Sequence, residues 1–187
     1  KAFSITILLL LVVSFILYRI KPATTDIYAR DGFALVSLSW ILVSVFGSLP
    51  FVLSGAIPSY IDAYFETVSG FTTTGASILR EVESLPRGIL FWRSFTHWIG
   101  GMGVLVLILA VLPSVKTGSL HIMQAESPGP NPEKLMPRIG DSAKFLYAIY
   151  LTMTATLVIL LLLAGLPFFD SLCHAFGTAG TGGFAIK

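Results

Sequence analysis

A polar stretch rich in threonine and glycine interrupts the apolar sequence twice, each time after a short apolar segment. The first copy, Thr-Thr-Thr-Gly-Ala-Ser, occupies residues 72–77 between two hydrophobic spans, and the second, Gly-Thr-Gly-Gly-Phe-Ala, occupies residues 180–185. Bare backbone at membrane depth is tolerated only where protein buries it or where it lines a water-filled path, because each unsatisfied amide or carbonyl in hydrocarbon costs several kcal/mol. The pattern therefore predicts two pore loops.

The composition indicates an integral membrane protein. Hydrophobic residues make up 55% of the chain and charged residues 12%, and the mean hydropathy is +0.84, whereas soluble domains carry roughly 25% charged residues. The net charge of +2 is too small and too scattered to favour nucleic acid as a partner. The single cysteine, Cys173, excludes an intrachain disulfide and a cysteine metal cluster.

Four apolar spans are long enough to cross a bilayer of roughly 30 Å, which takes about 20 helical residues. They cover residues 2–18, 32–53, 88–112 and 143–166. The first follows a lysine, as in a signal peptide, but no small-residue cleavage site follows it and a basic segment ends it. We interpret it as a transmembrane helix, and because it starts almost at residue one we expect an earlier part of the protein to precede it.

Residues 58–69 have the apolar content of a helix but are too few to cross the membrane. Pro58 and Ser59 give a helix start signal, and Asp62 suits the first turn, where the helix dipole favours an acidic side chain. At about 12 residues the segment fits a re-entrant half-helix. Its carboxyl end would point at the membrane centre and offer partial negative charge to a cation.

This layout occurs twice along the chain. An offset of 108 residues aligns Asp62 with Asp170, Glu66 with His174, Thr73 with Thr181, and Gly75 with Gly183. The sequence therefore predicts an all-α integral membrane fold of repeated units: transmembrane helix, re-entrant pore half-helix, filter loop, transmembrane helix. We divide the chain into a preceding helix with its linker, a first pore unit, a cytoplasmic loop and an incomplete second pore unit, at residues 1–30, 31–113, 114–141 and 142–187.

Lysine and arginine residues near the span ends predict the orientation. The segments that join the first span to the second and the third to the fourth carry seven of them, and the opposite side carries three. The side with seven is predicted to be cytoplasmic. Both polar stretches then face outward, as an uptake pathway requires.

Three separated motifs resemble a known family. Residues 65–77, Phe-Glu-Thr-Val-Ser-Gly-Phe-Thr-Thr-Thr-Gly-Ala-Ser, look like its first pore helix and filter; residues 98–104, Trp-Ile-Gly-Gly-Met-Gly-Val, resemble the start of its following helix; and residues 125–130, Ala-Glu-Ser-Pro-Gly-Pro, resemble its cytoplasmic loop. The family is the Trk/Ktr/HKT superfamily of potassium transporters. The extra span ahead of the first pore unit favours the TrkH branch over the shorter KtrB branch, and the resemblance covers essentially the whole chain.

The resemblance implies membrane potassium uptake through a pseudo-fourfold pore, with units built as in potassium channels. Each unit of such a pore gives one filter strand with a single key glycine, here Gly75 and Gly183. Family members are multi-pass proteins of the cell inner (plasma) membrane and form homodimers, and their cytoplasmic face binds a ring of nucleotide-binding regulatory subunits of the TrkA type. No cofactor is expected beyond the transported K⁺.

The expected ion site consists of backbone carbonyls that replace the hydration shell of a potassium ion. Its residues are Thr72, Thr73, Thr74 and Gly75 in the first filter strand and Gly180, Thr181, Gly182 and Gly183 in the second. The second strand departs from the first in that Gly180 and Gly182 stand at positions where the first has threonines. Glycine suits such a strand because it allows the positive φ that turns successive carbonyls inward.

Arg93 and His97 lie one helical turn apart in the outer part of the third span, where charged groups are costly and usually paired. Glu66, on the pore half-helix, is the natural partner for Arg93. We expect a structural ion pair near the pore, with a direct conducting role for the charges as the alternative. The histidines lack metal-ligand spacing, so packing or surface roles are expected for them. Residues 100–103, Gly-Gly-Met-Gly, are expected to pack closely against a neighbouring helix.

Two other function classes stay open. A secondary transporter also uses broken helices at the midplane, so sodium-coupled cation transport is one alternative, which saturable, sodium-dependent flux would favour. A non-conducting assembly subunit is the other, which would dimerise without flux. An enzyme is not expected, because no nucleophile with a base, carboxylate pair or metal cluster is visible. Since two filter strands cannot surround an ion, we expect the natural chain to continue through two further units.

Overall fold

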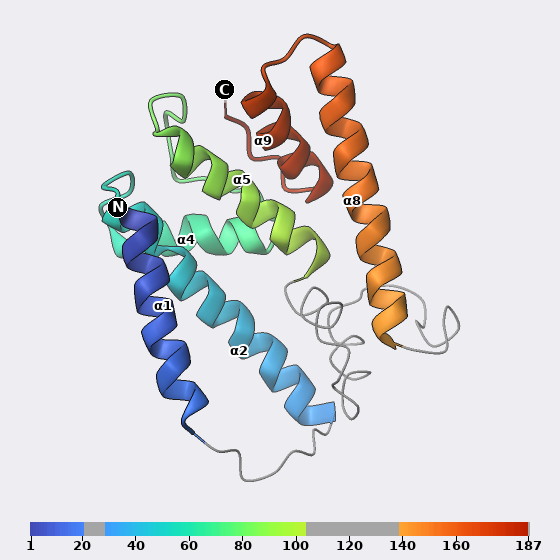
Figure 1. Cartoon of the computed structure of the whole chain (residues 1–187). Coiled ribbons are helices and arrows are strands. Elements are labelled where there is room, and N and C mark those ends of the chain that lie inside the picture. The colour runs from blue at the N-terminus through green and yellow to red at the C-terminus, as the bar shows by residue number, and fades with distance from the viewer. Residues whose placement is uncertain (21–28, 104–138, 187) are drawn as a thin grey trace.

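The structure is a computed structural model that describes residues 1–20, 29–103 and 139–186 of the chain. Within these ranges every regular element is a helix (Figure 1). The helices are α1 (Ala2–Tyr18), α2 (Ala29–Gly47), α3 (Leu49–Leu53), α4 (Tyr60–Phe71), α5 (Arg87–Met102), α8 (Ile139–Leu163) and α9 (Phe168–Ala179). The prediction of an all-helical fold is therefore confirmed for the described residues.

The predicted spans correspond to described helices. α1 coincides with the first span, α8 covers most of the fourth, and α2 with α3 make up the second. Two stretches, Phe33–Leu53 and Lys144–Leu163, are long and apolar enough to cross a membrane, and α1 is an apolar helix of 17 residues. The third span begins with α5, and its predicted continuation over 104–112 lies outside the described residues.

The second span is broken where α2 ends and α3 begins. Pro50 stands in the first turn of α3, and because proline has no backbone N–H it cannot continue the hydrogen bonding of α2. At the break, the hydroxyl of Ser48 donates a hydrogen bond to the carbonyl of Val45 at 2.7 Å. The indole N–H of Trp92, on α5, donates to the carbonyl of Gly47 at 2.9 Å and so fixes α5 to this point.

α5 is the central helix of the described structure. It packs against α4 on one side and α9 on the other, α2 lies against α4, and α8 lies against α9 (Figure 1). Apolar side chains of α5 enter two separate clusters: Ile89 packs with Phe51 and Ala63, and Leu90 packs with Cys173. One helix thus supports both predicted half-helices.

α8 is joined to α5 by polar and aromatic contacts. The hydroxyl of Tyr150 donates to the carbonyl of Trp98 at 2.9 Å, and the indole N–H of Trp98 donates to the hydroxyl of Thr154 at 3.1 Å. The Trp98 ring also lies 5.3 Å, centroid to centroid, from the ring of Phe176 on α9. Large apolar side chains on the other faces of α1 and α8 are exposed, among them Leu8 and Leu163, as expected for surfaces that face lipid.

Candidate functional site

The first polar stretch follows directly on α4, the predicted half-helix. Ser59 is the N-cap residue, and its hydroxyl accepts from the amide of Asp62 at 3.4 Å, so the predicted start signal is confirmed. Beyond the helix, the amide of Thr73 donates to the carbonyl of Gly70 at 3.1 Å and that of Thr74 to the carbonyl of Ser69 at 3.0 Å. These bonds fold the chain back tightly at the carboxyl end of α4.

The second polar stretch leaves α9 with the same backbone geometry. The amide of Thr181 donates to the carbonyl of Thr178 at 2.9 Å, and that of Gly182 to the carbonyl of Gly177 at 3.1 Å. Each bond corresponds, at the offset of 108 residues, to one at the end of α4. The sequence repeat is therefore also a repeat of backbone hydrogen bonds, over helices of 12 residues each.

Both strands place a threonine and a glycine in the left-handed region of the backbone. The φ angles are 55° for Thr73 and 58° for Thr181, and they are 75° for Gly75 and 77° for Gly183. A β-branched residue at positive φ is strained, and strain of this kind is typical of functional sites. Positive φ at alternate residues is the backbone feature expected of a strand whose carbonyls line an ion site.

The two stretches that the sequence predicts to be filter strands, residues 72–77 and 180–185, lie against one another. A Cβ atom built on Gly75 would overlap the carbonyl oxygen of Gly182 and would lie 3.1 Å from its carbonyl carbon. Gly75 is therefore required both by its φ angle and by the closeness of the second strand. Around Gly183, by contrast, no described atom lies within 4 Å of such a Cβ.

Two threonine side chains of the first strand form local hydrogen bonds. The hydroxyl of Thr72 donates to the carbonyl of Val68 at 2.8 Å, and it lies 2.8 Å from the hydroxyl of Thr74. The corresponding positions of the second strand, Gly180 and Gly182, carry no side chain. Because these two positions are glycines, another residue can occupy the space beside the second strand.

Two glycines of α5 support the bases of the two strands. A Cβ atom on Gly100 would overlap the carbonyl oxygen of Phe71, and one on Gly101 would lie 2.7 Å from the Cα of Gly180 and 2.6 Å from the hydroxyl of Tyr150. The expectation of close packing for this segment is thus met. At these two glycines α5 has no Cβ atom, so it can approach the backbone where each strand begins.

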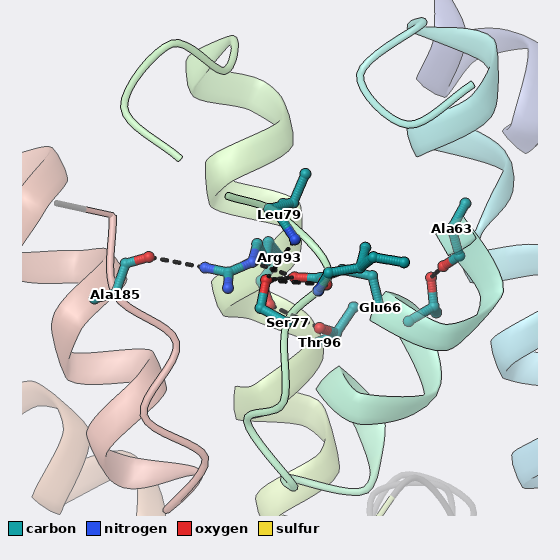
Figure 2. A network of polar contacts seen from close by, with 9 residues as sticks. Ala63, Glu66, Ser77, Leu79, Arg93, Thr96 and Ala185 are labelled. Atoms are coloured by element: carbon teal, nitrogen blue, oxygen red, sulfur yellow. Dashed lines mark hydrogen bonds and ion pairs between the residues drawn. The ribbon is translucent and has the colours of Figure 1, made fainter. Parts of the chain in front are cut away.

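Glu66 and Arg93 form the ion pair expected from the sequence. Arg93 Nε lies 2.6 Å from Glu66 Oε1, and the two residues are 3% and 1% exposed. The carboxylate also accepts from the hydroxyl of Ser77, at 2.9 Å and 3.1 Å, and from the amide of Ile78 at 3.0 Å. Glu66 thus holds the segment that leaves the first filter strand (Figure 2).

Arg93 also reaches the second strand. Its Nη1 donates to the carbonyl of Ala185 at 2.8 Å (Figure 2), and its guanidinium carbon lies 3.6 Å from the centroid of the Phe184 ring. One arginine therefore connects both filter strands. Ser77, Phe184 and Ala185 were not predicted as partners from the sequence, although their places one or two residues after Gly75 and Gly183 are the signal that could have found them.

His97 lies against the second strand. It is fully buried, as a packing role requires, and its ring contacts that of Phe184 with the centroids 3.9 Å apart. Among the described residues, no group of three or more histidine, cysteine, aspartate or glutamate side chains is arranged to hold a metal ion.

Comparison with known proteins gives consistent matches over most or all of the chain. The family model for TrkH, a cation transport protein, matches residues 1–187. The chain is 42% identical over 167 residues to the Trk system potassium uptake protein TrkH of Halomonas elongata, a match that covers 88% of the chain and 35% of the relative. It is 41% identical over 170 residues to the Trk system potassium uptake protein TrkG of Escherichia coli K12, covering 90% of the chain and 35% of the relative.

A solved structure has the same fold. The crystal structure of the potassium transporter TrkH from Vibrio parahaemolyticus superimposes with a TM-score of 0.77 at 35% sequence identity, over 100% of this chain and 37% of that one. The chain thus spans about a third of the length of the relatives that it matches.

Proposed function

The chain belongs to the TrkH family of cation transport proteins, and from this membership we propose that it forms part of a membrane pathway for potassium uptake. It is a helical membrane protein of this family, and the relatives named above are potassium uptake proteins. The observation that carries the proposal is the paired geometry of the two filter strands. Each follows a 12-residue half-helix, each has positive φ at a threonine and at a glycine, and the two touch at Gly75 and Gly182.

We assign the ion site to backbone carbonyls of the two strands. The carboxyl ends of α4 and α9 carry partial negative charge from the helix dipole, and both ends lead directly into the strands. Potassium binds where oxygens replace its water shell with little reorganisation. The proposed residues are Thr72, Thr73, Thr74 and Gly75 in the first strand and Gly180, Thr181, Gly182 and Gly183 in the second.

We further propose that the whole protein is a homodimer in the cell inner membrane with the filter strands facing outward. A nucleotide-binding regulatory subunit of the TrkA type docks on its cytoplasmic face. Potassium is the cargo, and no other cofactor takes part. The family membership and the lysine and arginine distribution support these assignments.

Reconstituted uptake tests the proposed function. We expect the intact protein in liposomes to take up rubidium, a tracer for potassium, and we expect excess potassium to compete for this uptake far better than excess sodium does. The uptake should proceed without sodium on either side. An absolute requirement for sodium would assign coupled transport instead, and the absence of flux from a folded, dimeric protein would assign an assembly role.

A further inference from the structure

His97 lies on α5 one turn after Arg93, and its side chain is completely buried. Neither ring nitrogen has a hydrogen-bond partner among the described residues. Burying an imidazole without partners is costly, and a phenylalanine or leucine would fill such a space without that cost. The described contacts of the imidazole are therefore packing contacts and not hydrogen bonds.

His97 contacts the second filter strand at three alternate residues, Gly180, Gly182 and Phe184. The imidazole occupies the space that a side chain on Gly182 would take, since a Cβ atom there would overlap Cδ2 and Nε2 of His97. The backbone of His97 supports Gly180, where a Cβ atom would lie 2.8 Å from the His97 carbonyl carbon. The imidazole also packs edge-on against the ring of Phe184, with the ring planes at 72°.

Among the described residues, the equivalent positions of the first strand are held in a different way. These positions are Thr72 and Thr74, whose hydroxyls lie 2.8 Å apart and form a hydrogen bond within the strand. The second strand has glycines at both positions, so it lacks this internal contact. His97 fills the volume that the two missing side chains would otherwise occupy.

We propose that His97 is a positioning residue for ion selection. It occupies the space that side chains at positions 180 and 182 of the second filter strand would fill. It holds Gly182 at the distance from Gly75 at which the carbonyls of both strands fit a dehydrated potassium ion. His97 contacts no ion and acts through Gly182. The inference rests on the proposed function, because it takes residues 180–183 to line an ion site.

A complementation experiment tests the contact between His97 and Gly182 in the intact protein. The readout is rubidium uptake into liposomes in the presence of competing potassium or sodium, at equal amounts of folded protein. Gly182→Ala adds a methyl group where the imidazole lies, and His97→Ala removes the support. We expect each single change to lower the potassium-over-sodium preference by about tenfold or more. In the double variant the new methyl group enters the space that the imidazole leaves, so we expect part of the preference to return.

Ile89→Ala is the matched control, because it also removes a buried side chain from α5 but does so in the cluster with Phe51 and Ala63, away from the second strand. We expect it to lower the yield of folded protein and to leave the ion preference unchanged. If His97→Ala does not accumulate, His97→Asn replaces it. Should both fail to accumulate while Ile89→Ala folds, His97 is a folding residue and the inference is wrong.

The remaining outcomes separate the two proposals. If the wild-type protein shows no preference for potassium, both the proposed function and the inference about His97 are wrong. A selective wild type whose preference survives His97→Ala, or whose Gly182→Ala defect is not reduced in the double variant, would overturn the inference alone.

Discussion

Gly75→Ala is expected to abolish most of the preference for potassium over sodium. The φ angle of 75° costs an alanine about 1–2 kcal/mol, and the added Cβ would overlap the carbonyl oxygen of Gly182. A backbone carbonyl cannot rotate away as a flexible side chain can, so the two strands must move apart. Because ion selection depends on the spacing of carbonyls, we expect the preference to fall by about tenfold or more.

The measurement is rubidium uptake by the intact protein with potassium or sodium as competitor. Gly55→Ala is the matched control: Gly55 also has a φ angle of 75°, but it lies in the turn after α3 and no described atom lies within 4 Å of the Cβ position. It should cost similar backbone strain and keep the wild-type preference. A Gly75→Ala protein with unchanged preference would show that these strands do not select the ion.

Glu66→Gln is expected to destabilise the protein strongly. It leaves the buried guanidinium of Arg93 without its anion, and removing one partner of a buried ion pair costs roughly 3–5 kcal/mol. The double variant with Glu66→Gln and Arg93→Met removes both charges, so no buried charge remains unpaired. We therefore expect the double variant to unfold at a higher temperature than Glu66→Gln alone, although it also loses the hydrogen bond to Ala185.

Thermal unfolding of the purified variants in detergent measures this difference. Glu81→Gln is the control, because Glu81 is an exposed carboxylate in the loop before α5, and exposed charges contribute little to stability. If Glu66→Gln were as stable as the double variant, the charge of Arg93 would cost no stability when Glu66 is neutral. The two side chains would then not stabilise one another as an ion pair. The arginine would then be held by its other contacts.

The sequence was sufficient to predict the described helices and the repeated backbone conformation of the two polar stretches that follow α4 and α9. Apolar spans and a helix start signal depend on neighbouring residues, so Ser59 could be identified as the start of α4 from local sequence alone. The offset that aligns Thr73 with Thr181 and Gly75 with Gly183 also predicted which residues share a backbone conformation. The ion pair between Glu66 and Arg93 could be predicted because a buried charge needs an opposite charge and few were available.

The contacts between the two strands could not be predicted in the same way. Arg93 bonds to Ala185, 92 residues further along the chain, and a backbone carbonyl carries no residue-specific signal in the sequence. The support of Gly182 by His97 depends on the way in which α5 packs against α9. Glycine at positions 180 and 182 indicated a difference from the first strand, but only the structure identifies the side chain that occupies the space.

The most direct test of this account is to locate the ion. Crystals of the intact protein grown in rubidium, with diffraction data collected at the rubidium absorption edge, would give an anomalous difference map in which only heavy scatterers appear. We expect a peak between the carbonyls of residues 72–75 and those of residues 180–183. An ordered filter region without a peak there, or a peak elsewhere along these helices, would contradict the assignment of these two strands as the potassium site.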